Sequence, residues 1–323
     1  MMGVTMWSKI GEAMLRSSET MEICMIKTPD HDYEKEFSSF LSQTNKLWQW
    51  HLDLAIHGEL DDLEARFYIG LLEGRIISNV STWERDSIGL VAHLLTARKH
   101  RNKGACTALM KAQMQDFRNR GGKVLIGGFR PASYSIAKRL GFKSITDNSE
   151  VMRCKLDPDF ERQYFRAEYV SCRDVIWKDW PGVSLLFTSK EGWILRSMNH
   201  GIFGPFDYED GFLEDMNRRL NGGCTSKVLA SEKGSIIGYA TLTFARHQKN
   251  TFWLLDFFVH HKSVSGLDTL LSALDFPQGE TRCYVEFKCR EKSHALMRRG
   301  FKEISQEQTR CHGKTVDTIL MEY

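Results

Sequence analysis

One stretch of the chain combines residue types that could hold a pyrophosphate group. Residues 93–110 read HLLTARKHRNKGACTALM, which is the end of an apolar strand, a basic turn and the start of an apolar helix. A turn that opens a helix points backbone N–H groups outward, and the helix dipole adds partial positive charge there. Gly104 would let the backbone approach an anion closely, and Arg101 and Lys103 would add charge. We therefore expect a phosphate-binding turn at residues 101–106.

The segments around this turn alternate between strand and helix patterns. Residues 89–96 favour a strand before the turn, and residues 103–119 favour a helix after it. Residues 124–126 indicate a short buried strand, and residues 133–142 indicate a helix that ends in Gly-Phe. Upstream, the pattern predicts strands at 22–26, 67–72, 76–83 and 88–96, and a helix from Asp30 or Asp32 to Phe40.

The turn Arg101-Asn102-Lys103-Gly104-Ala105-Cys106 resembles the R/Q-x-x-G-x-G/A signature of the GNAT N-acetyltransferase superfamily, with Cys106 where Gly or Ala is usual. The strand, helix and late Gly-Phe around it follow the order of that family. The resemblance implies an α/β (α+β) fold with a mixed, largely antiparallel central sheet flanked by helices. It also implies acetyl-CoA (coenzyme A) as co-substrate and no metal. The coenzyme would bind at residues 101–106 and pair with the backbone of Leu94, Leu95 and Thr96.

The chain repeats itself at a spacing of about 160 residues. Three pairs of landmarks recur in the same order: residues 73–78 with 233–238, Gly104 with Gly266, and residues 140–145 with 299–304. We interpret this as two tandem GNAT-like domains, with a tail at 1–20, an acetyl-CoA-binding domain at 21–160 and a degenerate domain at 161–323. The second turn, at 261–265, is one residue shorter and lacks the arginine. The coenzyme is therefore expected in the first domain alone.

Three residues near the expected site could move the protons of an acyl transfer. The tyrosine that the family uses as an acid is replaced by Ala137, but Tyr134 lies one turn earlier on the same helix face. His93 precedes the coenzyme strand positions and has the side chain best suited to a base at neutral pH. Glu84 is an alternative base that would act through water. A packing role for Tyr134, a core position for His93 and a solvated turn for Glu84 remain the competing interpretations.

In this superfamily, the segment between the first two strands forms a wall of the acceptor site. Here it contains two tryptophans in residues 47–52 and four carboxylates in residues 59–64. Aromatic rings beside acidic groups would suit a cationic amine. Trp48 and Leu52, four positions apart, favour instead a helix that packs on the core, followed by a solvated acidic turn.

Composition limits the other classes of function. The 323 residues include 44 Lys and Arg against 41 Asp and Glu, and this balance argues against a sequence-independent grip on nucleic acid. The eight cysteines contain no C-x-x-C pair, which favours reduced thiols in a cytoplasmic protein. No apolar run reaches the length of a membrane span.

Together these features predict an acetyl-CoA-dependent N-acetyltransferase, an acyltransferase that moves an acetyl group to a primary amine of a small molecule or peptide by direct attack. The alternative is a non-catalytic acyl-CoA-binding or sensor module. The oligomeric state stays open.

Overall fold

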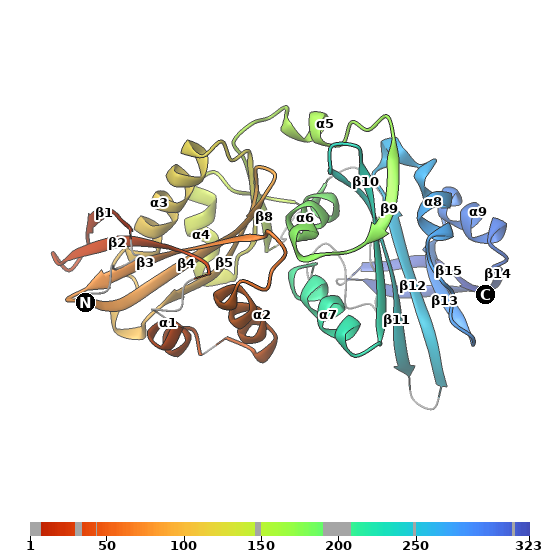
Figure 1. Cartoon of the computed structure of the whole chain (residues 1–323), viewed down its shortest axis with the longest axis horizontal. Coiled ribbons are helices and arrows are strands. Elements are labelled where there is room, and N and C mark those ends of the chain that lie inside the picture. Colours follow the sequence, from red (N-terminus) through yellow and green to blue (C-terminus); the bar gives the residue numbers. More distant parts are fainter. Residues whose placement is uncertain are drawn as a thin grey trace. The chain divides into compact units, whose positions relative to one another are not determined.

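The chain forms two compact units, each built on its own β-sheet (Figure 1). The computed structural model describes residues 8–29, 34–42, 44–145, 150–189, 208–247, 250–311 and 314–323. The first unit is Met1–Pro158 together with Trp177–Pro181, and the second is Asp159–Ile176 together with Gly182–Tyr323. A short segment from the second half of the sequence therefore belongs to the first unit.

Up to residue 155 the elements are β1 (Ser8–Met14), β2 (Thr20–Lys27), α1 (Glu34–Leu41), α2 (Lys46–His57), β3 (Glu64–Leu72), β4 (Arg75–Arg85), β5 (Ile88–Thr96), η1 (Arg98–His100), α3 (Ala105–Asn119), β6 (Val124–Gly128), α4 (Pro131–Arg139), β7 (Lys143–Ser144) and β8 (Val151–Lys155). They are followed by α5 (Phe160–Tyr164), β9 (Val170–Asp174), η2 (Trp177–Asp179), α6 (Trp180–Thr188), α7 (Tyr208–Leu220), β10 (Cys224–Ser231), β11 (Ile236–His247), β12 (Asn250–Val259), η4 (His261–Ser263), α8 (Gly266–Ser272), β13 (Thr281–Glu286), α9 (Arg290–Arg298), β14 (Lys302–Cys311) and β15 (Lys314–Glu322). The expected helix start at Asp30 or Asp32 lies outside the described residues.

The two sheets share one strand order. The first runs β1-β2-β3-β4-β5-β6-β8-β7, and the second, read from its other edge, runs β9-β10-β11-β12-β13-β15-β14. Every strand of the second sheet thus has a counterpart in the first, which carries β1 in addition. Among the described residues only the pairs β5·β6 and β12·β13 are parallel. This confirms two mixed, largely antiparallel sheets flanked by helices.

The extra strand β1 lies where the sequence predicts an N-terminal tail. Its residues pair antiparallel with β2, from Ser8 opposite Met25 to Met14 opposite Thr20. Lys9 forms ion pairs with Glu12 at 2.7 Å and Glu22 at 3.1 Å. Charged residues such as Lys9 and Glu12 interrupt the apolar pattern of this segment. They are compatible with an edge strand whose side chains face water. Residues 8–14, expected in the N-terminal tail, thus form an edge strand of the first sheet.

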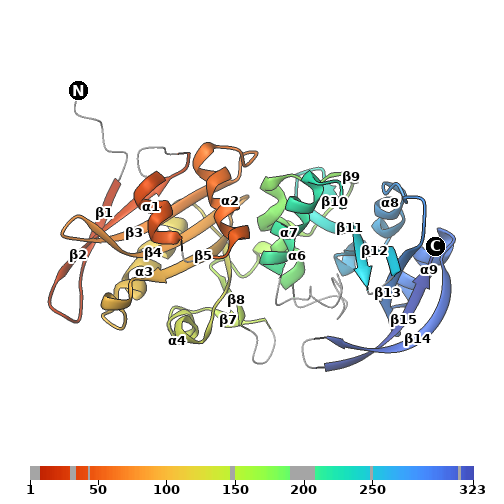
Figure 2. The same cartoon turned by 90° about the horizontal axis from the view of Figure 1, so that it is seen from below.

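In the first unit, α1 and α2 cover one face of the sheet and α3 covers the other (Figures 1 and 2). On the α3 face, Leu109 and Met110 pack with Val80 and Val91 in one buried cluster. On the α2 face, the ring of Phe37 in α1 meets that of Phe67 in β3 with centroids 4.5 Å apart. Each strand side chain therefore belongs to either the α2 face or the α3 face.

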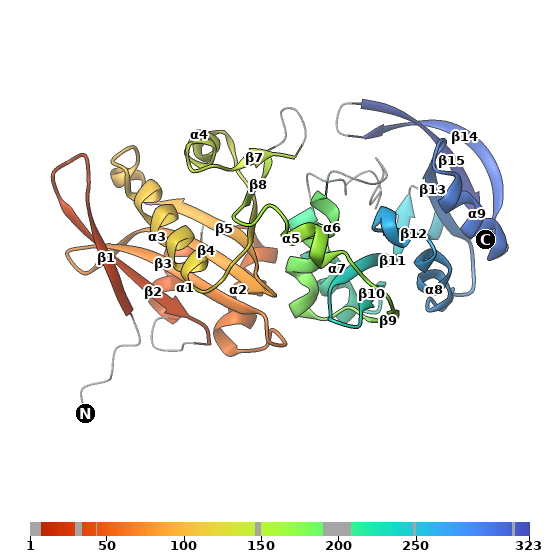
Figure 3. The same ribbon diagram turned by 90° about the horizontal axis from the view of Figure 1, so that it is seen from above.

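The second unit is also covered on both faces of its sheet. Tyr239 of β11 donates a hydrogen bond to Asp215 of α7 at 2.8 Å. On the opposite face, Leu229 of β10 packs against Gly266 of α8. Figure 3 shows β14 and β15 as a long curved hairpin in this unit.

Candidate functional site

The predicted phosphate-binding turn adopts a left-handed entry into α3. Asn102 has φ +61° and Gly104, the residue before the helix, has φ +98°. No side chain caps the helix, and its first turn contains no acidic residue. Residues 105–107 therefore present backbone N–H groups at the positive end of a 15-residue helix dipole. An anion is the chemical group that such a helix start accepts.

The two basic side chains of the turn, Arg101 and Lys103, contact other parts of the protein and stabilise the conformation of the turn. Arg101 donates from Nε to the carbonyl oxygen of Thr96 at 3.1 Å. Lys103 forms an ion pair with Glu19 at 3.3 Å, and its carbonyl oxygen accepts from the backbone N–H of Arg16 at 2.9 Å. The connection between β1 and β2 thus supports the turn. In this arrangement the helix amides, more than the two side chains, supply the surface for an anion.

The strand before the turn separates from its neighbour where the coenzyme is expected. β5 pairs with β6 only from Ile88 to Leu90. Beyond that point β5 keeps β4 as its partner, and the β4–β5 register shifts between Asn79 and Ser81. The residues from His93 to Thr96 are partly exposed. This end of β5 leaves one edge for an extended ligand, as expected for Leu94, Leu95 and Thr96.

The register shift is a β-bulge at His93. Its φ is +49°, and its carbonyl oxygen accepts from Asn79 Nδ2 at 3.0 Å. Leu94 packs into the cluster on the α3 face. His93 lies on the α2 face, where its ring meets the edge of the Trp48 ring at 4.9 Å. Simple alternation along the strand could not reveal this, because a bulge places one extra residue on a face.

The imidazole of His93 is held in a dry environment. Its Nδ1 is 2.9 Å from Ser81 Oγ, and its Nε2 has no hydrogen-bond partner among the described residues. Burial lowers the pKa of His93 to about 4. At neutral pH the ring is uncharged and able to accept a proton, but so low a pKa makes it a weak base.

Tyr134 lies on α4 with its hydroxyl already engaged. Its Oη is 2.8 Å from Ser144 Oγ of β7, and its ring packs against the α3-face cluster. Ala137, at the family's tyrosine position, is completely buried. A larger side chain at position 137 would meet this core.

We expect Tyr134→Phe to lower kcat by about tenfold, or 1.4 kcal/mol, with coenzyme affinity unchanged, if the hydroxyl protonates the leaving thiolate. Ser144→Ala is the matched control, since it removes the same hydrogen bond but keeps the phenol. Steady-state kinetics and calorimetry on both variants provide the measurement. Equal kcat values for wild type and Tyr134→Phe would assign the tyrosine to packing.

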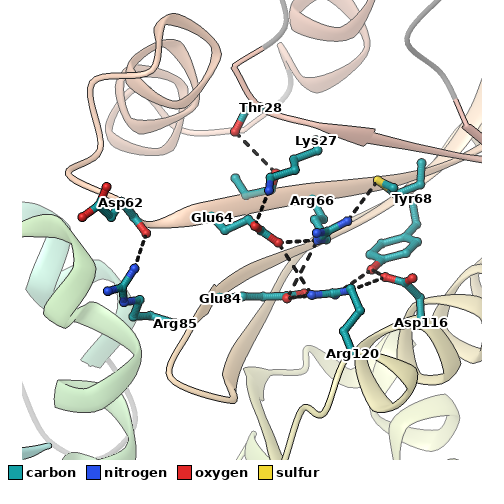
Figure 4. Close-up of polar contacts among 12 residues, drawn as sticks. Lys27, Thr28, Asp62, Glu64, Arg66, Tyr68, Glu84, Arg85, Asp116 and Arg120 are labelled. Carbon is teal, nitrogen blue, oxygen red and sulfur yellow. Dashed lines mark hydrogen bonds and ion pairs between the residues drawn. The ribbon is translucent and has the colours of Figure 1, made fainter. Parts of the chain in front are cut away.

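Glu84 occupies a different environment from the solvated turn that the sequence suggests. It lies in β4, is 6% exposed, and forms ion pairs with Arg120, the residue after α3 (2.5 Å), and with Arg66 of β3 (4.0 Å) (Figure 4). It pairs with Gly89 at the start of β5, whereas the coenzyme positions lie at the other end. Burial raises its pKa, although Arg120 opposes the shift. A buried charge needs partners, and the Glu84 carboxylate finds them in Arg66 of β3 and in Arg120 at the end of α3. Its role is therefore to connect the sheet to this helix.

The segment between the first two predicted strands has features of both interpretations, the aromatic acceptor wall and the helix that packs on the core. α2 buries Leu52 against the core, as the four-residue spacing predicts. Trp48, on the same helix, remains partly exposed beside His93. In the acidic turn, Asp62 forms an ion pair with Lys178 at 3.7 Å, and Asp61 Oδ2 accepts from the Trp177 N–H at 3.5 Å.

Four residues around this wall were missed by sequence reasoning: His51, Trp83, Trp177 and Trp180. A local signal existed only for His51, which follows Trp48 and Trp50 in a W-x-W-H pattern. The two distant tryptophans carry no signal that relates them to α2.

The corresponding turn of the second unit lacks each of these features. Ser265, before α8, has right-handed helical angles, and α8 has seven residues. Gly266 lies inside the helix, where a Cβ would stand 2.4 Å from the Leu229 side chain, so it serves packing. Its correspondence with Gly104 therefore does not extend to conformation. The β11–β12 register is continuous, without a bulge.

Within the described part of the chain, no helix is both long and apolar enough to cross a membrane. The same residues contain no group of three or more His, Cys, Asp or Glu side chains placed to hold a metal ion.

The acetyltransferase (GNAT) family model matches residues 27–142 of the chain. The resemblance of the turn is thereby confirmed, and the family supports acyl transfer and acetyl-CoA binding in general terms. No curated protein matches the chain.

Several solved structures are similar to about half of the chain. The ribosomal-protein-alanine N-acetyltransferase from Brucella melitensis is 19% identical, covers 47% of this chain and 98% of its own, and has a TM-score of 0.40. A phosphinothricin acetyltransferase from Sinorhizobium meliloti, in complex with AcCoA, is 17% identical over 48% and 87% of the two chains, with a TM-score of 0.39. The spermidine N-acetyltransferase from Vibrio cholerae, in complex with CoA and spermine, is 13% identical over 48% and 94%, with a TM-score of 0.33.

Proposed function

We propose that the first unit is an N-acetyltransferase that moves an acetyl group from acetyl-CoA to a primary amine of a small molecule or peptide in the cytoplasm. The observation that carries this proposal is the uncapped start of α3 behind left-handed Gly104, directly after the bulged end of β5. The helix amides would take the pyrophosphate, and the edge of β5 would pair with the amides of the pantetheine arm. Neither role requires a metal.

Acetyl transfer from a thioester to an amine requires few catalytic side chains. The thioester supplies a carbonyl carbon that a neutral amine attacks, which forms the C–N bond, and the thiolate leaves when the C–S bond breaks. A backbone N–H near the β5 bulge would stabilise the oxyanion. The ammonium form of the acceptor must first lose a proton, and His93, uncharged at neutral pH, is the candidate to receive it. Tyr134 would return a proton to the thiolate.

The second unit is assigned no coenzyme. The second unit has a shorter turn, a right-handed Ser265 before α8 and a continuous β11–β12 register. The first site instead has the longer turn, left-handed Gly104 and the β-bulge in β5. We therefore expect calorimetry with acetyl-CoA to show one site per chain. Two equivalent sites would contradict the asymmetry.

Turnover separates this proposal from a coenzyme-binding sensor. Ala137 at the family's acid position and the low pKa of His93 are the observations that favour a sensor. Release of free coenzyme A should be measured against a panel of amines, together with binding. Acetylation of any amine at enzymatic rates supports the transferase, whereas tight binding without acceptor-dependent turnover supports the sensor.

A further inference from the structure

Five aromatic rings of the first unit gather on the α2 face beside the bulge. This aromatic cluster consists of Trp48 and His51 of α2, Trp83 of β4, His93 of β5, and Trp180. Ring centroids lie 4.1 Å apart for His51 and Trp83, 4.9 Å for His51 and Trp180, and 5.8 Å for Trp48 and Trp180. His51, Trp83 and Trp180 are completely buried, whereas Trp48 and His93 are partly exposed. The cluster therefore has a buried floor, and Trp48 and His93 stand in front of it.

The segment Trp177–Pro181 supplies part of that floor. The Trp177 ring stacks on His51 at 5.1 Å, and Trp180 is 0% exposed. Lys178 and the Trp177 N–H hold the segment to the acidic turn at Asp61 and Asp62. Burial of the two indole rings removes a large apolar area from water, which stabilises the segment in the first unit.

The cluster offers polar atoms but little charge. Both ring nitrogens of His51 and Nε2 of His93 are buried without a hydrogen-bond partner among the described residues. Burial lowers the pKa of each imidazole, so both rings are neutral at pH 7. Asp61 and Asp62, which could attract a polycation, are already engaged by residues 177 and 178. The front of the cluster is thus a partly exposed Trp48 indole beside a neutral His93 imidazole whose Nε2 is buried.

We propose that the aromatic cluster binds the acceptor, and that this acceptor is a primary amine carried on an aromatic or similarly apolar group. The amine would stand at His93, with its apolar group against Trp48. Trp180 is a positioning residue, because it contacts Trp48 and His51 from behind. The inference rests on the proposed acetyltransferase function.

Acceptor preference tests the chemical class. The full chain should acetylate 2-phenylethylamine with a kcat/KM at least about tenfold higher than spermidine, because the cluster offers ring contacts while Asp61 and Asp62 are engaged by residues 177 and 178. Equal or better use of spermidine would overturn the inference. Binding of acetyl-CoA without acetylation of 2-phenylethylamine would overturn it as well and leave the coenzyme site standing. Loss of acetyl-CoA binding altogether would instead contradict the proposed function.

Substitutions test the positioning role. Trp180→Phe should raise the KM for 2-phenylethylamine by about fivefold or more, with the Kd for acetyl-CoA within twofold of wild type. Trp253→Phe is the matched control, since Trp253 packs on Phe244 in the second unit, and it should change neither constant. A purely structural role would lower the melting temperature without raising the KM of the folded enzyme, and would overturn the assignment.

Trp48→Leu covers the case in which Trp180→Phe does not fold. Trp48 is partly exposed, so its replacement leaves the floor of the cluster in place. The same rise in acceptor KM is expected, and an unchanged KM would contradict acceptor binding at the cluster.

Discussion

Gly104→Asp should weaken acetyl-CoA binding by about 100-fold or more, which corresponds to about 2.7 kcal/mol. A carboxylate at the start of α3 would oppose the negative pyrophosphate in the region that the helix amides serve. The added side chain would not collide with the protein, because no atom lies within 4 Å of a Cβ at this position. Isothermal titration calorimetry on the folded variant measures the loss.

Gly104→Ala is the control for backbone strain. Both substitutions force an L residue into φ +98°, at a cost of about 1–2 kcal/mol in stability, but alanine adds no charge. We expect alanine to reduce coenzyme affinity by less than about tenfold. Similar affinities for the aspartate variant and wild type would remove the assignment of the pyrophosphate to this turn.

Arg120→Ala should lower the free energy of unfolding by about 2–3 kcal/mol. The substitution leaves Glu84, which is 6% exposed, without its main counter-charge. This loss of stability is smaller than for a fully buried ion pair, because the Arg120 side chain is 29% exposed and water can solvate Glu84 in its place. Chemical denaturation followed by tryptophan fluorescence measures the change.

Arg118→Ala, in the last turn of α3, provides the comparison. Arg118 is exposed, so its loss should change stability by less than about 0.5 kcal/mol. Glu84→Gln then separates structure from catalysis, since it should lower stability while kcat stays within twofold of wild type. A large fall in kcat with unchanged stability would restore Glu84 as a base.

The local order of elements could be read from the sequence because each depends on near neighbours. The period of apolar residues located β5, α3 and β6, and Gly104 marked the left-handed turn between strand and helix. The shortened turn at 261–265 likewise indicated that the second unit differs from the first at this position. In the structure, Ser265 has right-handed helical angles and precedes a seven-residue helix. These features follow from backbone preferences within a few residues.

Features that depend on distant pairing were not accessible in the same way. The bulge that turns His93 toward α2 arises from the register of β5 against β4, so the strand pattern alone left its face undecided. Glu84 looked solvated because its partner Arg120 lies 36 residues away. Residues 8–14 looked like a tail because an exposed edge strand has no apolar face to reveal it.

By itself, the sequence determined the turn before α3, its resemblance to the GNAT family and the difference between the turns of the two halves, since each depends on contiguous residues. Only the tertiary structure decided which groups stand around His93 and that Trp177–Pro181 belongs to the first unit. The physical reason is that burial of an indole is nondirectional. Many apolar sites could bury the Trp180 ring, and the shape of the folded unit selects the one beside α2.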